Sequence, residues 1–139
     1  MATTSKIRTP VTHFLNVDLD VYSRNDLQPL VSRLGGKVSV LYVGRERKRY
    51  SAHLELTKVT SSADSTISAF CRLIQTLPKA EMNLWTAATR RSFSVGVEAG
   101  ETPTTRDFVI RPKTVKAVSE LAAEIVFTIY APEQLTTHA

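Results

Sequence analysis

Residues 14–22 read FLNVDLDVY, an uninterrupted alternation of apolar and polar side chains. Such alternation is typical of a β-strand with one buried and one exposed face. A similar pattern follows at residues 49–58 and again at residues 93–98. Strands of this kind form antiparallel sheet that is covered on one side only. The sequence therefore predicts a sheet whose polar face is open to solvent.

Between these strands, apolar residues recur at the spacing of an α-helix. The clearest helix begins within residues 61–64, and its apolar stripe consists of Ile67, Phe70, Cys71, Ile74 and Leu77. Ser23 and Asp26 resemble a capping box at the start of an earlier helix. Pro112 is suited to open a later one, whose apolar positions are expected at Val115, Val118 and Leu121 or Ala122.

One hydrophobic pattern occurs twice along the chain. Its first copy is Leu27, Leu30, Val38 and Tyr42, and its second is Val115, Val118, Val126 and Tyr130. Each copy indicates a short helix followed by a strand, at residues 37–43 and 125–130, and residues 108–110 add a short strand. The order β-α-β-β-α-α-β-(β)-α-β predicts an α+β two-layer sandwich. Its sheet would be ferredoxin-like (split β-α-β) and mainly antiparallel, with helices on one face.

Length and composition limit the class of protein. The 139 residues predict a single α+β domain at 13–131, with flexible tails at 1–12 and 132–139. No apolar run approaches the roughly 20 residues that span a bilayer, and no secretory signal is evident, so we expect a cytoplasmic location. The single cysteine excludes an internal disulfide. No cofactor is expected.

Four polar residues of the predicted sheet form the main candidate site for a ligand or metal. Asp18 and Asp20 share the polar face of the first strand, and His53 and Glu55 share that of the third. These strands are neighbours in a split β-α-β sheet, so the side chains would converge. Carboxylates and an imidazole together can bind a divalent metal or transfer protons. The simpler interpretation is a wet sheet face without a site, and a third is a surface for a partner.

The second candidate is a predicted charged turn at residues 44–48, with four cations at or beside it: Arg45, Arg47, Lys48 and Arg49. The formal net charge of +5 permits an acidic partner. Several cations on one face also bind phosphate, so this hairpin is a candidate contact for either. The alternative is an exposed turn that protects a sheet edge. The predicted open face is acidic and lacks the paired aromatic rings of sheet-based RNA readers, which argues against nucleic acid.

Three segments together carry a resemblance to known proteins. They are residues 16–23 (NVDLDVYS), 93–100 (FSVGVEAG) and 127–132 (FTIYAP). They resemble a family of small bacterial proteins of similar length, described only as a domain of unknown function, and the likeness covers residues 13–132. It implies a bacterial, cytoplasmic, single-domain protein. It implies no catalytic or binding residue.

Signatures of several enzyme classes are absent from the sequence. It contains no nucleophile elbow, no P-loop and no His-Glu-x-x-His helix. Cys71 lies in an apolar stripe, which is typical of a core residue. We therefore expect a binding or regulatory domain without catalytic activity, acting through the open sheet face, as a homodimer or with another protein. The alternatives are a metal-dependent or hydrolytic enzyme and a nucleic-acid-binding protein.

Overall fold

A five-stranded sheet runs through the part of the chain that the computed structural model describes, residues 9–58 and 60–132. Its strands are β1 (His13–Ser23), β2 (Val38–Glu46), β3 (Arg49–Leu56), β4 (Arg90–Glu98) and β5 (Glu124–Tyr130). The helices are α1 (Gln28–Leu34), α2 (Ala63–Gln75), α3 (Lys79–Ala87) and α4 (Pro112–Glu120), with a 3₁₀ turn η1 (Gly35–Lys37) after α1. The spatial order of the strands is β2-β3-β1-β4-β5. Only β4 and β5 run parallel, so the protein is α+β with an open, mostly antiparallel sheet.

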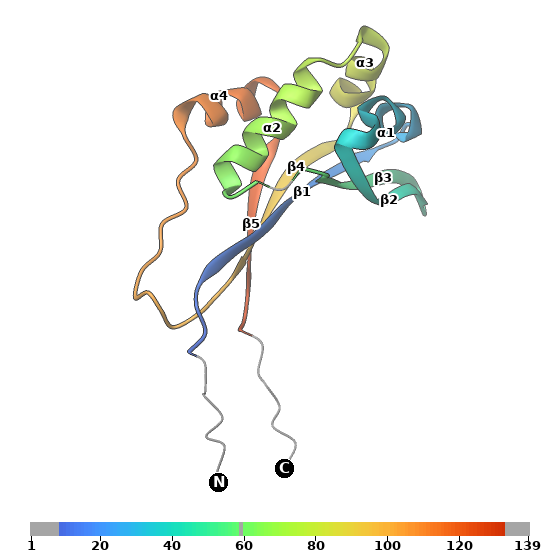
Figure 1. The fold of residues 1–139 in the computed structure, drawn as a ribbon. Helices are drawn as coiled ribbons and strands as arrows, with labels where there is room; N and C mark the ends of the chain where they lie inside the picture. The colour runs from blue at the N-terminus through green and yellow to red at the C-terminus, as the bar shows by residue number, and fades with distance from the viewer. Residues whose placement is uncertain (1–8, 59, 133–139) are drawn as a thin grey trace.

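The helices gather over one face of the sheet, as Figure 1 shows. The alternation in β1 produces this division, because Val17, Leu19 and Val21 are fully buried while Asp18 and Asp20 are only half-buried. The predicted strand and its two faces are therefore confirmed from residue 16 on, whereas Leu15 is 47% exposed because the pairing register shifts between Phe14 and Asn16. Within the described residues, no helix combines the length and the apolar character needed to cross a bilayer.

Helix α2 contributes most of the helical side of the core. The Ser62 hydroxyl caps it by accepting a hydrogen bond from the Ser65 backbone N–H at 3.1 Å. Its stripe is confirmed for Ile67, Phe70, Cys71 and Ile74, which are all buried. Leu77, predicted as its last member, lies after the end of α2 and is half-buried. The Phe70 ring lies 5.8 Å from the Phe93 ring of β4, which joins helix to sheet. Burying each large apolar side chain stabilises the fold by about 1.5–3 kcal/mol relative to exposure.

Two local predictions about helices are wrong. Ser23 and Asp26 form no capping box, because the Asp26 carboxylate accepts the Gln28 N–H at 2.9 Å and α1 has no side-chain cap. Val115 is 49% exposed, because α4 turns Thr114 and Val118 toward the core instead. The buried stripe of α4 thus starts one residue earlier than the apolar pattern indicates.

The segment between β4 and α4 also differs from the prediction. Residues 108–110 form no strand and lie in a loop that spans residues 99–111. Nearby, the described residues 10–12 of the predicted N-terminal tail bind this loop, with Thr12 N–H donating to Thr102 O at 2.9 Å. Gly100 permits the contact, since a Cβ there would lie 2.4 Å from the carbonyl carbon of Val11. Residues 1–8 and 133–139 of the predicted tails lie outside the described residues.

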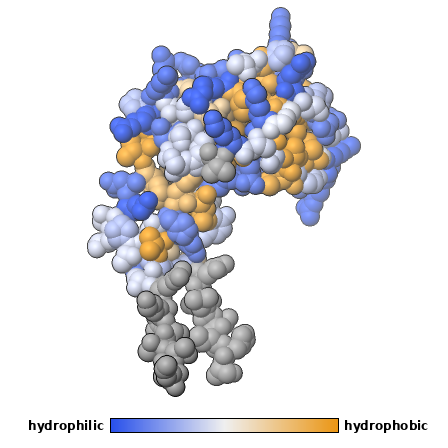
Figure 2. All heavy atoms as spheres, viewed as in Figure 1, coloured by the Kyte–Doolittle hydropathy of each residue, from blue (hydrophilic) through white to orange (hydrophobic). Residues whose placement is uncertain are grey.

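The two helix–strand units with the repeated pattern end at opposite edges of the sheet. Strand β2 follows α1 at one edge, and β5 follows α4 at the other. The lower ends of β4 and β5 extend beyond the helices in Figure 1, and apolar surface is visible there in Figure 2. This explains why Phe127 and Ile129 are exposed although they point to the helical side.

Candidate functional site

The open sheet face brings an imidazole and a carboxylate into direct contact. The register of β1 and β3 sets Asp20 opposite His53. His53 Nδ1 lies 2.6 Å from Asp20 Oδ1, and the two side chains are 28% and 19% exposed. Both side chains are therefore shielded by their neighbours but still reached by solvent.

Two further polar residues complete the cluster and were not among the predicted site residues. Ser94 of β4 donates its hydroxyl proton to Asp20 Oδ2 at 2.7 Å. Asn16 of β1 donates its amide to Glu55 of β3. We call this group, with His53 and Asp18, the polar cluster. Asn16 and Ser94 lie on the same face of adjacent strands, so the strand alternation that revealed the other residues could also have revealed these.

Asp18 differs from the other carboxylates of the polar cluster. Burial, followed by the negative charges of Glu55 and Asp20, raises its pKa to about 6, and His53 partly opposes this rise. Among the described residues, no hydrogen bond reaches the Asp18 carboxylate. At neutral pH it therefore carries a charge that its surroundings disfavour, and a nearby cation would stabilise it.

The polar cluster presents charged and hydrogen-bonding groups on an open surface. Within residues 9–58 and 60–132, no three His, Cys, Asp or Glu side chains are arranged to hold a metal ion. Both oxygens of Asp20 already accept hydrogen bonds or contact His53. What the cluster offers is negative charge and hydrogen-bond acceptors on a flat sheet face.

Aromatic and cationic side chains adjoin the polar cluster on the same face. The Tyr22 and Tyr42 rings lie 5.7 and 6.1 Å from the His53 ring. Two aromatic rings are thus present on the face for which the sequence predicts no paired base-stacking rings, and both contact His53. The Arg49 guanidinium covers Tyr22 at 4.2 Å, and Arg90 approaches it at 5.9 Å. With its ring covered in this way, Tyr22 is not free to stack on a base.

The predicted basic hairpin is present, with a tighter turn than expected. Residues 44–46 belong to β2, and the turn itself consists of Arg47 and Lys48. The backbone of Arg47 has φ 55°, a left-handed value that glycine adopts more readily. A hollow of about 780 Å³ at this turn is lined by the consecutive residues 46–49. It is therefore a surface depression beside the turn, and no other described strand or helix encloses it.

The four cations of the hairpin do not share one direction. Arg45 lies over the Tyr50 ring at 5.8 Å, on the helical side of the sheet, whereas Arg49 lies over Tyr22 on the open side. Arg47 and Lys48 extend from the tip and are exposed. The hairpin is therefore a charged projection at one end of the sheet, visible at the right of Figure 1.

Two other side chains with reactive or charged groups have structural roles. Cys71 is 1% exposed, and burial raises the pKa of its thiol to about 11, so it is a protonated core residue. Arg91 donates to the carbonyls of Trp85 and Ala88 at the end of α3, at 2.9 and 2.7 Å, and to Ala122 O at 2.9 Å. Arg91 therefore acts as a cation at the C-terminal end of α3.

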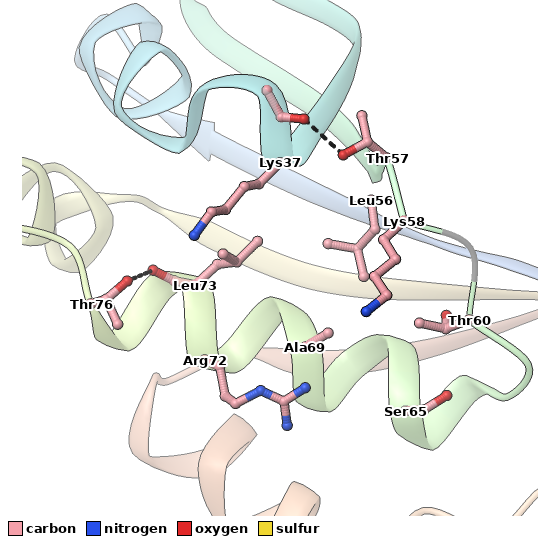
Figure 3. Close-up of a pocket in the computed structure, with 11 residues that line it drawn as sticks. Lys37, Leu56, Thr57, Lys58, Thr60, Ser65, Ala69, Arg72, Leu73 and Thr76 are labelled. Atoms are coloured by element: carbon pink, nitrogen blue, oxygen red, sulfur yellow. Dashed lines mark hydrogen bonds between the residues drawn. The ribbon is translucent and has the colours of Figure 1, made fainter.

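A cleft that the sequence does not reveal lies on the helical side, between α2 and the end of β3. Its volume is about 600 Å³, and its rim carries Lys37, Lys58 and Arg72. These cations come from η1, from the segment after β3 and from α2, so no local pattern predicts that they meet. Figure 3 shows Lys37 and Lys58 extending toward α2 above an apolar floor.

No family model matches this chain, and neither a curated protein nor a solved structure matches it. The resemblance of residues 16–23, 93–100 and 127–132 to a bacterial domain therefore stays a prediction.

Proposed function

We propose that this protein is a non-catalytic protein-interaction domain of the cytoplasm and that it forms a homodimer. The open sheet face of one copy binds the basic β2–β3 hairpin of the other. The observation that carries the proposal is the opposite charge of these two surfaces on one chain.

Charge on the open face supports a cationic occupant. Four carboxylates lie along its middle and lower part: Asp18, Asp20, Glu55 and Glu98. The chain as a whole has a formal net charge of +5, whereas these four side chains are negative; the cations of the same face, Arg49 and Arg90, lie around Tyr22. A cation from a partner would lower the raised pKa of Asp18. Complementary patches of this kind steer association and fix its geometry.

The shape of the hairpin supports its role as that occupant. Arg47 and Lys48 are exposed at the tip of a two-residue turn at one end of the sheet. In a two-fold symmetric dimer every contact between the copies forms twice. The hairpin of each copy would therefore reach the carboxylates of the other. The exposed side chains of Leu41 and Tyr42 on β2 would add apolar area beside the charges.

We also propose that β1 to β4 with α1 and α2 form a ferredoxin-like unit. Supporting this, these four strands have the spatial order β2-β3-β1-β4 and all pair antiparallel. Helix α4 and strand β5 would then be an extension of that unit beside β4.

Charge-reversal variants test the proposed homodimer. Sedimentation velocity should show a dimer for the unaltered protein, weakening as salt is raised. Arg47→Glu and Asp18→Lys should each lower the association constant by about tenfold or more, because a charge pair becomes a repulsion. An equimolar mixture of the two variants should restore a dimer, which native mass spectrometry identifies as a heterodimer by its mass.

Controls separate this contact from general charge effects. Lys113→Glu changes the net charge equally, lies on the exposed side of α4, and should leave the dimer intact. If Asp18→Lys melts at a much lower temperature, Asp18→Asn replaces it and should weaken the dimer less. A monomer at high micromolar concentration, or two variants that fail to restore each other, would overturn the proposal.

A further inference from the structure

The cleft on the helical side is independent of the open sheet face and combines features of a ligand site. It is formed by η1, the end of β3 with the residues after it, and one face of α2. Its volume of about 600 Å³ lies within the roughly 300–1,000 Å³ typical of small-molecule sites. The cleft therefore has room for a small organic molecule.

The charge of the cleft is entirely positive among its lining residues. Lys37, Lys58 and Arg72 line it, and no Asp or Glu does. Within the described residues, none of these three cations forms an ion pair with a carboxylate. The only hydrogen bond of the Arg72 guanidinium there is with the Ser68 hydroxyl, at 3.2 Å. Three uncompensated cations around one hollow attract an anion that carries more than one charge.

Hydroxyl groups and an apolar floor complete the cleft. The Thr60 and Ser65 side chains line the cleft near the start of α2 (Figure 3), where the Thr60 hydroxyl is hydrogen-bonded to Thr66 and the Ser65 hydroxyl donates to Ser62 O at 3.1 Å. Leu56, Ala69 and Leu73 form a half-buried apolar floor. A purely inorganic anion would leave this floor in contact with water, whereas a ligand with an apolar body would cover it.

We infer that this cleft binds a phosphorylated small molecule whose phosphate carries an apolar or aromatic body. The phosphate lies next to Lys37 and Lys58, where charge-assisted hydrogen bonds are stronger than neutral ones, and Arg72 extends from the other edge of α2 (Figure 3). The planar guanidinium of Arg72 can offer two parallel N–H donors to a phosphate, and the lysines act as point charges. The body lies against Leu56 and Leu73.

Binding of phenyl phosphate, measured by calorimetry and by NMR shifts of the α2 amides, tests the inference. Phenyl phosphate should bind saturably, and inorganic phosphate should bind at least about fivefold more weakly because it covers no apolar floor. Phenol, which lacks the phosphate, should not bind measurably. AMP is the fourth compound. If AMP binds more tightly than phenyl phosphate, the ligand is a nucleotide; if it binds more weakly, the ligand is another phosphate ester.

Neutral variants of the cations locate the site. Arg72→Gln and Lys58→Gln should each weaken phenyl phosphate binding by about tenfold. Lys113→Gln removes the same charge from α4, away from the cleft, and should leave the affinity unchanged. Ala69→Leu keeps every charge but narrows the floor, so it should weaken phenyl phosphate more than inorganic phosphate.

Three outcomes would overturn the inference. They are an absence of saturable binding, an equal loss of affinity in Lys113→Gln and Arg72→Gln, and equal binding of phenyl phosphate and phenol. Circular dichroism confirms that each variant is folded before its affinity is compared. Because Arg72, Lys58 and Ala69 lie on the helical side, none of these results depends on whether the open sheet face forms a dimer.

Discussion

His53 Nδ1 lies 2.6 Å from Asp20 Oδ1, whereas no hydrogen bond within the described residues reaches Asp18 on the same strand face. Two carboxylates on one face of β1 thus have different surroundings. Asp20 is held by His53 and by the Ser94 hydroxyl, and Asp18 faces burial and like charges. The open face is therefore organised around one fixed carboxylate and one that is electrostatically disfavoured.

We predict that Asp18→Asn removes a pH dependence of stability. Folded Asp18 keeps its proton to about pH 6, while the ordinary pKa of this group is 3.8. The native state thus binds more protons between these values, so the free energy of unfolding of the unaltered protein falls as pH rises through this range. Allowing for solvent screening of a half-exposed group, the loss is about 1–2 kcal/mol. The variant should be more stable by that amount at pH 7.

Urea unfolding of both proteins between pH 3.5 and pH 7 (roughly the range set by the two pKa values) measures this difference. The two proteins should converge at the acid end, where Asp18 is neutral in both states. Asp107→Asn, in the exposed loop before α4, should leave the pH profile unchanged. A difference of constant size at every pH would show that Asp18 acts through packing and not through its charge.

Ser51→Ala should stabilise the protein. The Ser51 side chain is fully buried on β3, and its hydroxyl has no hydrogen-bond partner in the structure. Removing an unpaired buried hydroxyl should raise the free energy of unfolding by about 1 kcal/mol. Ser92→Ala is the matched comparison, because Ser92 is also buried but donates to Glu124, and it should lower stability by about 1 kcal/mol. Equal losses in thermal melts would contradict the prediction.

Gly100→Ala should detach the N-terminal segment from the loop after β4. A methyl group at Gly100 would meet the backbone of residues 10–12, which no side-chain movement can relieve. We expect a loss of about 2 kcal/mol or more in stability. Hydrogen exchange should show lost protection at Thr12 N–H, which donates to Thr102 O. Gly36→Ala, where nothing lies within 4 Å of the added carbon, should leave stability nearly unchanged. Retained protection of the Thr12 N–H in Gly100→Ala would contradict the prediction.

Arg91→Lys should be destabilising although it keeps the charge. The Arg91 guanidinium joins the end of α3 to the segment after α4 by donating to Trp85 O, Ala88 O and Ala122 O. A lysine ammonium cannot reproduce this planar set of donors, so we expect a loss of about 1–3 kcal/mol. Arg90→Lys, which alters an exposed pair with Glu124, should leave stability nearly unchanged. Similar melting temperatures for both variants would contradict this.

The strands and the polar cluster were predictable from sequence because both depend on a local period. Alternation assigns Asp18 and Asp20 to one face whatever the rest of the chain does. Placing His53 and Glu55 beside them required only that β3 be a neighbour of β1, which the structure confirms. Asn16 and Ser94 follow from the same rule, but their side chains are not titratable, so no charge pattern distinguishes them from other polar strand residues.

Neither the buried face of α4 nor the cationic cleft could be predicted, because both depend on how the helices pack on the sheet. Val115 and Thr114 are adjacent in sequence, and only the packing of α4 beside α2 and β5 decides that Thr114 is the buried one. Lys37, Lys58 and Arg72 are far apart in the chain. Their meeting requires the docking of α2 beside η1, which no period in the sequence encodes.

The backbone of Arg47 has a consequence for any attempt to engineer this protein. At φ 55° an arginine is disfavoured by about 1–2 kcal/mol, whereas glycine adopts this conformation readily. Arg47→Gly is thus an obvious candidate in a search for heat-resistant variants. The same exchange removes one of the two positive charges of the turn. A screen for thermal stability alone would therefore select variants that have lost any interaction made by this charge.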